Sequence, residues 1–204
     1  MRRLGAVVLA TALGPGGCVA YVGGANPIDP DRVAREPGWM GAATPEVSQS
    51  SPTDCGPAAL SMVARHWQVT LPLEEAVEAV PEPSKRGVKL GDLRAAARER
   101  GLVAFAIQGD RETLIRELRA GRPVIVGLIL PHRLGRVRSH YEVVIAVRPE
   151  TDEFVTIDPA ADWQVRTWDA LDEEWRAAGR PSLVVLGWDA HAAVACGGAR
   201  GSGD

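Results

Sequence analysis

Hydrophobic and polar positions follow two patterns along the chain, with helical periods first and β-branched runs later. The segment Ala58–Ala64 is apolar on nearly every face, which predicts a helix buried in the middle of a domain, and Pro57 suits its first turn. Shorter amphipathic helices are expected at Leu73–Val80, Asp92–Arg100 and Asp110–Ala120. The first half of the domain is therefore expected to be mainly helical.

Runs of strand length, rich in β-branched residues, occupy the second half of the chain. They are Pro123–Leu130, Tyr141–Val147, Phe154–Ile157 and Leu183–Leu186. No fixed-period repeat is present. Helices followed by strands indicate a single α+β domain with a mixed or antiparallel sheet.

The first 18 residues have the layout of a secretory signal: a basic start, the apolar stretch Leu4–Leu13 and small residues before Cys18. A cysteine after small residues resembles a bacterial lipoprotein cleavage site, so Cys18 is expected to become the lipid-modified first residue. Pro15 departs from that pattern, which usually has a leucine-like residue there. Cleavage near Ala20 and a retained N-terminus remain alternatives.

The chain therefore divides into a signal segment, a linker, a domain and a tail. Residues 1–18 form the signal, and residues 19–45 are expected to be a linker, with or without an arm that packs on the domain. Residues 46–188 form the domain, and residues 189–204 are expected to be disordered. We therefore expect an exported protein of the bacterial cell envelope, held at a membrane as a lipoprotein.

Composition narrows the classes of function. The chain has 204 residues, of which 46% are hydrophobic and 24% charged, enough for one globular domain. The formal net charge is −3, so the chain has no excess of basic residues that would favour binding to nucleic acid. The longest apolar run is about ten residues, short of the roughly 20 that span a bilayer as a helix. No phosphate-binding loop or zinc-ligand spacing is present, so we expect no metal and no cofactor.

Cys55 carries the first chemical signal, because it lies at the start of the predicted buried helix. Free backbone N–H groups and the helix dipole at that position favour a thiolate. The alternative is a small apolar residue that simply begins a core helix. Export would permit a disulfide between Cys55 and Cys196 without predicting one. Cys196 and His191 form a weaker candidate pair, since their setting is typical of a mobile tail.

His140 and Asp158 are predicted to meet across a hairpin. A reversal centred on Pro149 would place them directly opposite each other and on one face, where the carboxylate would orient the imidazole. Gln49 precedes Cys55 by six residues in a loop-forming stretch, so its amide could lie beside the thiol and stabilise an oxyanion. Taken singly, each of these polar residues could instead be a solvated strand-end, turn or loop residue.

The motifs that contain these residues together resemble those of one enzyme family. They are Gln49-Ser-Ser-Pro-Thr-Asp-Cys55-Gly-Pro-Ala-Ala-Leu-Ser-Met-Val63, Ser139-His-Tyr-Glu-Val-Val144 and Ile157-Asp-Pro159. The chain resembles cysteine peptidase family 39, the papain-like peptidases that process bacteriocin leaders. The likeness also covers Gly87–Leu102 and the start of the predicted strand that follows Arg122.

The resemblance implies a papain-like α+β fold, with N-terminal helices packed on a C-terminal antiparallel sheet. It also implies that Cys55 is the nucleophile, His140 the general base and then acid, Asp158 its orienting partner and Gln49 the oxyanion donor. The reaction would be hydrolysis of a peptide bond, with a polypeptide as the partner and no cofactor.

The substrate is expected to differ from that of the well-known family members, which are domains of exporters and cut leaders after two glycines. No transporter or ATPase segment is found in this sequence, and an exported enzyme would meet its substrate after translocation. Two alternatives remain: a non-catalytic peptide-binding module, and a cysteine-dependent amidase or acyltransferase.

Two further groups of residues have open interpretations. The tryptophans Trp163, Trp168, Trp175 and Trp188 could line a substrate groove, although large aromatics there are more often core. The basic stretch His132–Arg138 could be a lid that recognises acidic substrate residues, although a solvated loop is the more usual structure.

Overall fold

The computed structural model describes residues 23–81, 87–131 and 135–187. The predicted signal segment with Cys18 and the predicted tail with His191 and Cys196 lie outside the described residues. Within the described ranges, no helix combines the length and the apolar character needed to cross a bilayer.

One antiparallel sheet forms the centre of the domain, with strand order β1-β7-β6-β5-β4-β8-β3 and with β2 paired to β5. Its strands are β1 (Asn26–Pro27), β2 (Met40–Gly41), β3 (Val103–Gln108), β4 (Val124–Pro131), β5 (Val137–Arg148), β6 (Glu153–Asp158), β7 (Asp162–Thr167) and β8 (Pro181–Leu186). The antiparallel arrangement confirms the expected α+β class, and β5 is the long central strand on which the site is built.

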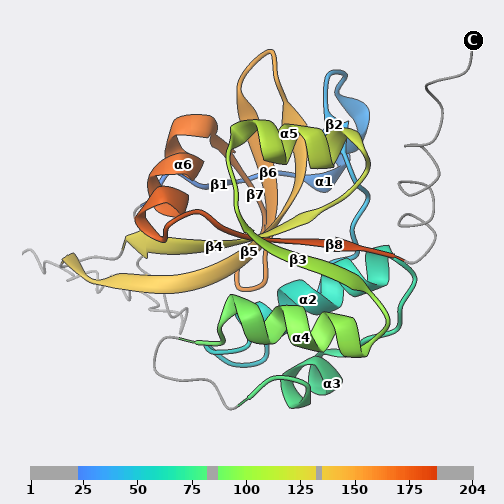
Figure 1. The fold of residues 1–204 in the computed structure, drawn as a ribbon. Coiled ribbons are helices and arrows are strands. Elements are labelled where there is room, and N and C mark those ends of the chain that lie inside the picture. Colours follow the sequence, from blue (N-terminus) through green and yellow to red (C-terminus); the bar gives the residue numbers. More distant parts are fainter. Residues whose placement is uncertain (1–22, 82–86, 132–134, 188–204) are drawn as a thin grey trace, which may run out of the picture.

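Helices cover both faces of the sheet (Figure 1). They are α1 (Pro30–Arg35), α2 (Cys55–His66), α3 (Leu73–Glu78), α4 (Leu90–Glu99), α5 (Arg111–Arg119) and α6 (Trp168–Ala177). The N-terminal helices α2, α3 and α4 share one hydrophobic core with the sheet, as expected. The helices α5 and α6 share a second core on the opposite face. Both lie between strands in the sequence, so the helices do not all precede the strands.

Helix α2 is the buried helix that the apolar run predicts. Every residue from Cys55 to Ala64 is buried, and Leu60 and Met62 are fully enclosed. Pro57 lies in the first turn, where a missing N–H breaks no intrahelical bond. Gly56 allows the close approach to the sheet, because a Cβ there would lie 3.2 Å from Cδ2 of Tyr141 on β5. The start of α2 is thus held against β5.

The segment before α2 packs on the sheet through β1, α1 and β2. β1 pairs with β7 and β2 pairs with β5. The Arg148 guanidinium lies 4.3 Å from the centre of the Trp39 ring and binds Glu36 at 2.5 Å. Much of the range for which the sequence suggests a linker or an arm is thus arranged as a packed arm.

A β-bulge in β5 decides which residues of the β5–β6 hairpin share a face. Arg148 pairs with Glu153, and that register alone would pair Asp158 with Val143, whose side chain faces α2. The register shifts between Val144 and Ala146, which leaves Ile145 as the extra residue. Beyond the bulge Val143 pairs with Ile157. Asp158 is thereby moved to the face that carries His140.

The register predicted from the sequence was therefore wrong by two residues. Continuing the observed pairing places Asp158 opposite Glu142 and diagonal to His140, not directly opposite it. The turn spans residues 149–152 rather than being centred on Pro149, which shifts the register by three residues, and the bulge shifts it back by one. A shift of two residues keeps the same face, because side chains alternate with a period of two.

Candidate active site

Cys55 is the first residue of α2 and is 5% exposed. Burial alone would raise the pKa of its thiol. The side chain of His140 with its positive charge, the backbone N–H of Tyr141 and the charge of Arg138 outweigh burial and lower that pKa. The position at a helix N-terminus acts in the same direction. The site therefore stabilises a thiolate at Cys55.

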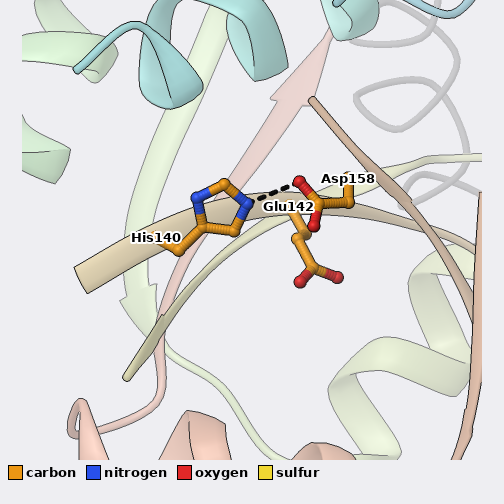
Figure 2. Close-up of side chains that lie close together, drawn as sticks. All are labelled: His140, Glu142 and Asp158. Atoms are coloured by element: carbon orange, nitrogen blue, oxygen red, sulfur yellow. Dashed lines mark hydrogen bonds and ion pairs between the residues drawn. The ribbon is translucent and has the colours of Figure 1, made fainter. Parts of the chain in front are cut away.

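His140 and Asp158 form a buried hydrogen bond of 2.6 Å between Nε2 and Oδ1 (Figure 2). His140 is 2% exposed and Asp158 8% exposed. The backbone N–H of Ala160 donates to the same carboxylate oxygen at 2.8 Å, which fixes its orientation. With the Nε2 proton directed at Asp158, the lone pair of a neutral imidazole lies on Nδ1.

The other ring nitrogen of His140 serves the thiol. Nδ1 is on the side of the ring away from Asp158 and has no hydrogen-bond partner within the part of the chain that the structure describes. Burial would lower the pKa of His140, but the interactions with Asp158 and Cys55 outweigh it and raise the pKa to about 10. A lowered thiol pKa and a raised imidazole pKa favour a thiolate–imidazolium pair at neutral pH.

Gln49 lies in the loop before α2, and this loop is hydrogen-bonded to the turn that follows Asp158. The backbone N–H of Gln49 donates to the carbonyl of Pro159 at 2.9 Å. Its side-chain Nε2 donates to the carbonyl of Ser51 at 2.9 Å. Ser50 in turn donates to the Asp54 carboxylate at 2.7 Å. The amide is thereby held in place, with a second N–H left to act as a donor.

A groove of about 580 Å³ opens beside the thiol. Its lining includes Pro52, Thr53, Cys55, Ile129, Arg138 and Tyr141. The Arg138 guanidinium donates to the carbonyl of Pro52 at 3.0 Å, so it braces the loop before Cys55. Arg138 belongs to the basic stretch His132–Arg138 considered above as a lid, of which the structure describes residues 135–138. A groove of this size next to a nucleophile suits an extended chain.

The tryptophans do not form this groove. Trp175 is fully buried and lies edge-on to Trp168, with ring centroids 6.3 Å apart. Trp163 packs against the core on the α2 side. Trp175 is thus a core residue, Trp163 and Trp168 are half-buried against the two cores, and Trp188 lies outside the described residues.

Charged residues that the sequence analysis did not single out lie directly behind the His140–Asp158 pair. Glu142 and Arg166 are joined by two hydrogen bonds of 3.0 and 2.9 Å, and Arg166 also binds Glu174 at 3.0 Å. One ring nitrogen of His140 and one carboxylate oxygen each of Glu142 and Asp158 lie within 4.8 Å of one another. The sequence feature that could have identified this pair is a charged residue within each of two largely buried strands, Glu142 in β5 and Arg166 in β7.

Comparison with known proteins supports the resemblance stated above. The family model described as Peptidase C39 family matches residues 43–178, about two thirds of the chain. No curated protein matches the chain.

Solved structures share the fold. A double glycine motif protease from an AMS/PCAT transporter, in complex with the leader peptide, is 20% identical, with a TM-score of 0.58 over 72% of this chain and 94% of that chain. The peptidase domain of Streptococcus ComA, a bifunctional ABC transporter involved in quorum sensing, is 24% identical, with a TM-score of 0.57 over 69% and 96%. A C39-like peptidase from Bacillus anthracis is 17% identical, with a TM-score of 0.56 over 70% and 94%.

Proposed function

Because the chain belongs to the Peptidase C39 family, we propose that it is a cysteine peptidase whose nucleophile is Cys55. The observation that carries the proposal is the buried 2.6 Å bond between His140 and Asp158, with the thiol of Cys55 interacting with the same imidazole. A cysteine with no catalytic task would not need an oriented base and a lowered pKa.

The proposed reaction is acyl transfer through two steps. The Cys55 thiolate attacks the carbonyl carbon of the peptide, and the resulting oxyanion accepts hydrogen bonds from the Gln49 amide and the backbone N–H of Cys55. His140 gives its Nδ1 proton to the leaving amine as the C–N bond breaks. Water then loses a proton to His140 and attacks the thioester, which releases the acid and restores the thiol proton to the Cys55–His140 pair.

Asp158 has a supporting role in this scheme. Its carboxylate accepts a hydrogen bond from Nε2–H of His140 throughout, which fixes the ring and stabilises the imidazolium. Burial would raise the pKa of Asp158, but the contacts with His140, the N–H of Ala160 and the charge of Arg166 lower it. Asp158 is therefore ionised over the whole neutral range.

A polypeptide is the proposed substrate. The structural relative from the AMS/PCAT transporter is bound to a leader peptide, and the groove beside Cys55 is large enough for an extended chain. We further propose that the protein is exported and anchored through Cys18, so that it acts on an exported polypeptide. A binding module and an amidase or acyltransferase remain the competing functions, and each predicts that peptides are not cut.

The direct test exposes the full-length protein to a degenerate library of unstructured peptides and identifies new termini by mass spectrometry. We expect cleavage by the wild type and by Cys196→Ala, the matched control that changes another cysteine. We expect none by Cys55→Ala. Binding of peptides without cleavage would support the module, and cleavage that survives Cys55→Ala would refute the proposed mechanism.

A further inference from the structure

Behind the His140–Asp158 pair lies a buried network of three charged side chains from three elements. Glu142 of β5, Arg166 of β7 and Glu174 of α6 have side chains that are 1%, 1% and 4% exposed. Arg166 binds Glu142 through both carboxylate oxygens and Glu174 through its other terminal nitrogen. Such a network carries a large desolvation penalty, which packed apolar residues would avoid.

The network adjoins the site because of the register of the sheet. Beyond the bulge, Glu142 lies opposite Asp158 and on the same face as His140. Figure 2 shows the Glu142 carboxylate next to Asp158, on the side away from Nδ1 of His140. One oxygen of each carboxylate lies within 4.8 Å of the other and of a His140 nitrogen. Two buried carboxylates this close repel each other unless each has a cation beside it, and the imidazolium of His140 is hydrogen-bonded to Asp158.

Arg166 is the cation beside Glu142. Its two bonds to Glu142 neutralise the carboxylate nearest to Asp158, and its positive charge also acts on Asp158 itself. Arginine suits the role because it stays charged at any pH that the fold survives and its two terminal nitrogens can each bind a carboxylate. Glu174 binds the second terminal nitrogen and holds the guanidinium in place.

We propose that Arg166 is a positioning residue that keeps Asp158 ionised, and therefore His140 oriented, by neutralising Glu142. The inference rests on the proposed function, since it assigns a role within the same site. It gives the charged network a role behind a hydrogen bond that is already complete.

Other charged groups around Asp158 and His140 are accounted for in the test. They are Cys55 at the start of α2, Arg138 and Glu142 on β5, Asp162 at the start of β7 with Glu46 beside it, Arg166 on β7 and Glu174 on α6. Arg138 and Arg166 are the cations in this set, and Arg138 is bonded to the loop before Cys55. Neutralisation of Glu142 therefore falls to Arg166.

The test measures the rate at which iodoacetamide alkylates Cys55 as a function of pH, with peptide mapping to identify the modified cysteine. Arg166→Met removes the cation and leaves Glu142 beside Asp158. We expect the acid limb of the profile to move to higher pH, so that alkylation at pH 5 slows about tenfold, the effect of one uncompensated like charge at this range.

A charge-balanced variant separates this role from a merely structural one. In Glu142→Gln/Arg166→Met both charges of the pair are gone, so we expect the acid limb to return toward its wild-type position. Glu142→Gln alone should move the limb to lower pH or leave it in place. A structural role predicts the opposite order, with the double variant affected most. That order, or an unmoved limb in Arg166→Met, would overturn the proposal.

Controls keep the outcomes distinct. Arg122→Met breaks a comparable Arg–Glu pair, 2.6 Å between Arg122 and Glu117, and should lower the melting temperature without moving the limb. Should Arg166→Met fail to fold, Arg166→Lys and Glu142→Gln carry the test: a shift to higher pH in either would count against the proposal. A wild-type profile that does not depend on His140 would instead count against the proposed function.

Discussion

The two halves of the site are built by different kinds of structure. Cys55 is positioned by local sequence, because an apolar helix with Gly56 and Pro57 in its first turn places the thiol at a helix N-terminus. His140 and Asp158 are positioned by a strand register that depends on one extra residue, Ile145. The nucleophile is therefore readable from a short stretch of sequence, while the base and its partner depend on the whole sheet.

The surroundings of the two halves differ in the same way. The face of the sheet toward α2 packs a mainly apolar core around the helix that carries Cys55. The opposite face combines an apolar core with the buried network of Glu142, Arg166 and Glu174. Substitutions on the helix side should therefore act through packing, and substitutions on the sheet side should act through charge.

Asp158→Asn gives the largest expected effect on the sheet side. The amide keeps the shape of the carboxylate but no longer stabilises the imidazolium or selects the tautomer. The equivalent change in a serine-protease triad costs about 10⁴ in kcat, and we expect a loss approaching that size.

The pH profile of Asp158→Asn has a defined direction. Asp158 helps to raise the pKa of His140 to about 10. Without it the imidazolium should lose its proton at lower pH, so the alkaline limb of peptide hydrolysis moves down. Measuring kcat against pH checks this, and an alkaline limb that stays in place would contradict the assigned role of Asp158.

Gln49→Ala tests the loop that joins the two halves. If the amide donates to the oxyanion, its loss should lower kcat by about 10²–10³ and leave KM almost unchanged. The matched control is Gln164→Ala, which removes an amide that donates to the carbonyl of Ala161. A change in KM alone would show that Gln49 binds substrate without stabilising the transition state.

Leu60→Ala gives the smallest expected effect on activity and tests the packing side of the comparison. Leu60 is fully buried in α2, so its truncation should lower the free energy of unfolding by about 2–5 kcal/mol. Leu118→Ala makes the same change in the core beneath α5. Denaturant unfolding and kcat at a temperature where both variants are folded should show lost stability with activity retained. A fall in kcat for Leu118→Ala alone would contradict the division between the two faces.

The sequence predicted the helix side well, for a physical reason. An all-apolar run of this length has few stable arrangements other than a buried helix, and the run beginning at Ala58 lies within α2 as expected. The expected helices near Leu73, Asp92 and Asp110 also formed, with ends shifted by one or two residues. Local periodicity and end signals decide such elements.

The sheet side was only partly predictable. β7 was missed because Gln164 and Arg166 occupy inward positions, which hides the alternation that identifies a strand. α6 was missed beside it, in a stretch where the tryptophans drew attention to the sheet. The meeting of His140 with Asp158 was expected, but from a simpler hairpin. A bulge and a buried ion pair depend on contacts between distant residues, and hydrophobic patterns do not record them.

The central claim is that Cys55 and His140 share a proton as a thiolate–imidazolium pair. The measurement that tests it most directly is the pH dependence of Cys55 alkylation in the wild type and in His140→Ala. The account predicts rapid alkylation of Cys55 well below pH 7 in the wild type, and an acid limb displaced toward the pKa of an ordinary thiol, near 8.5, in the variant. Identical profiles in the two proteins would contradict it.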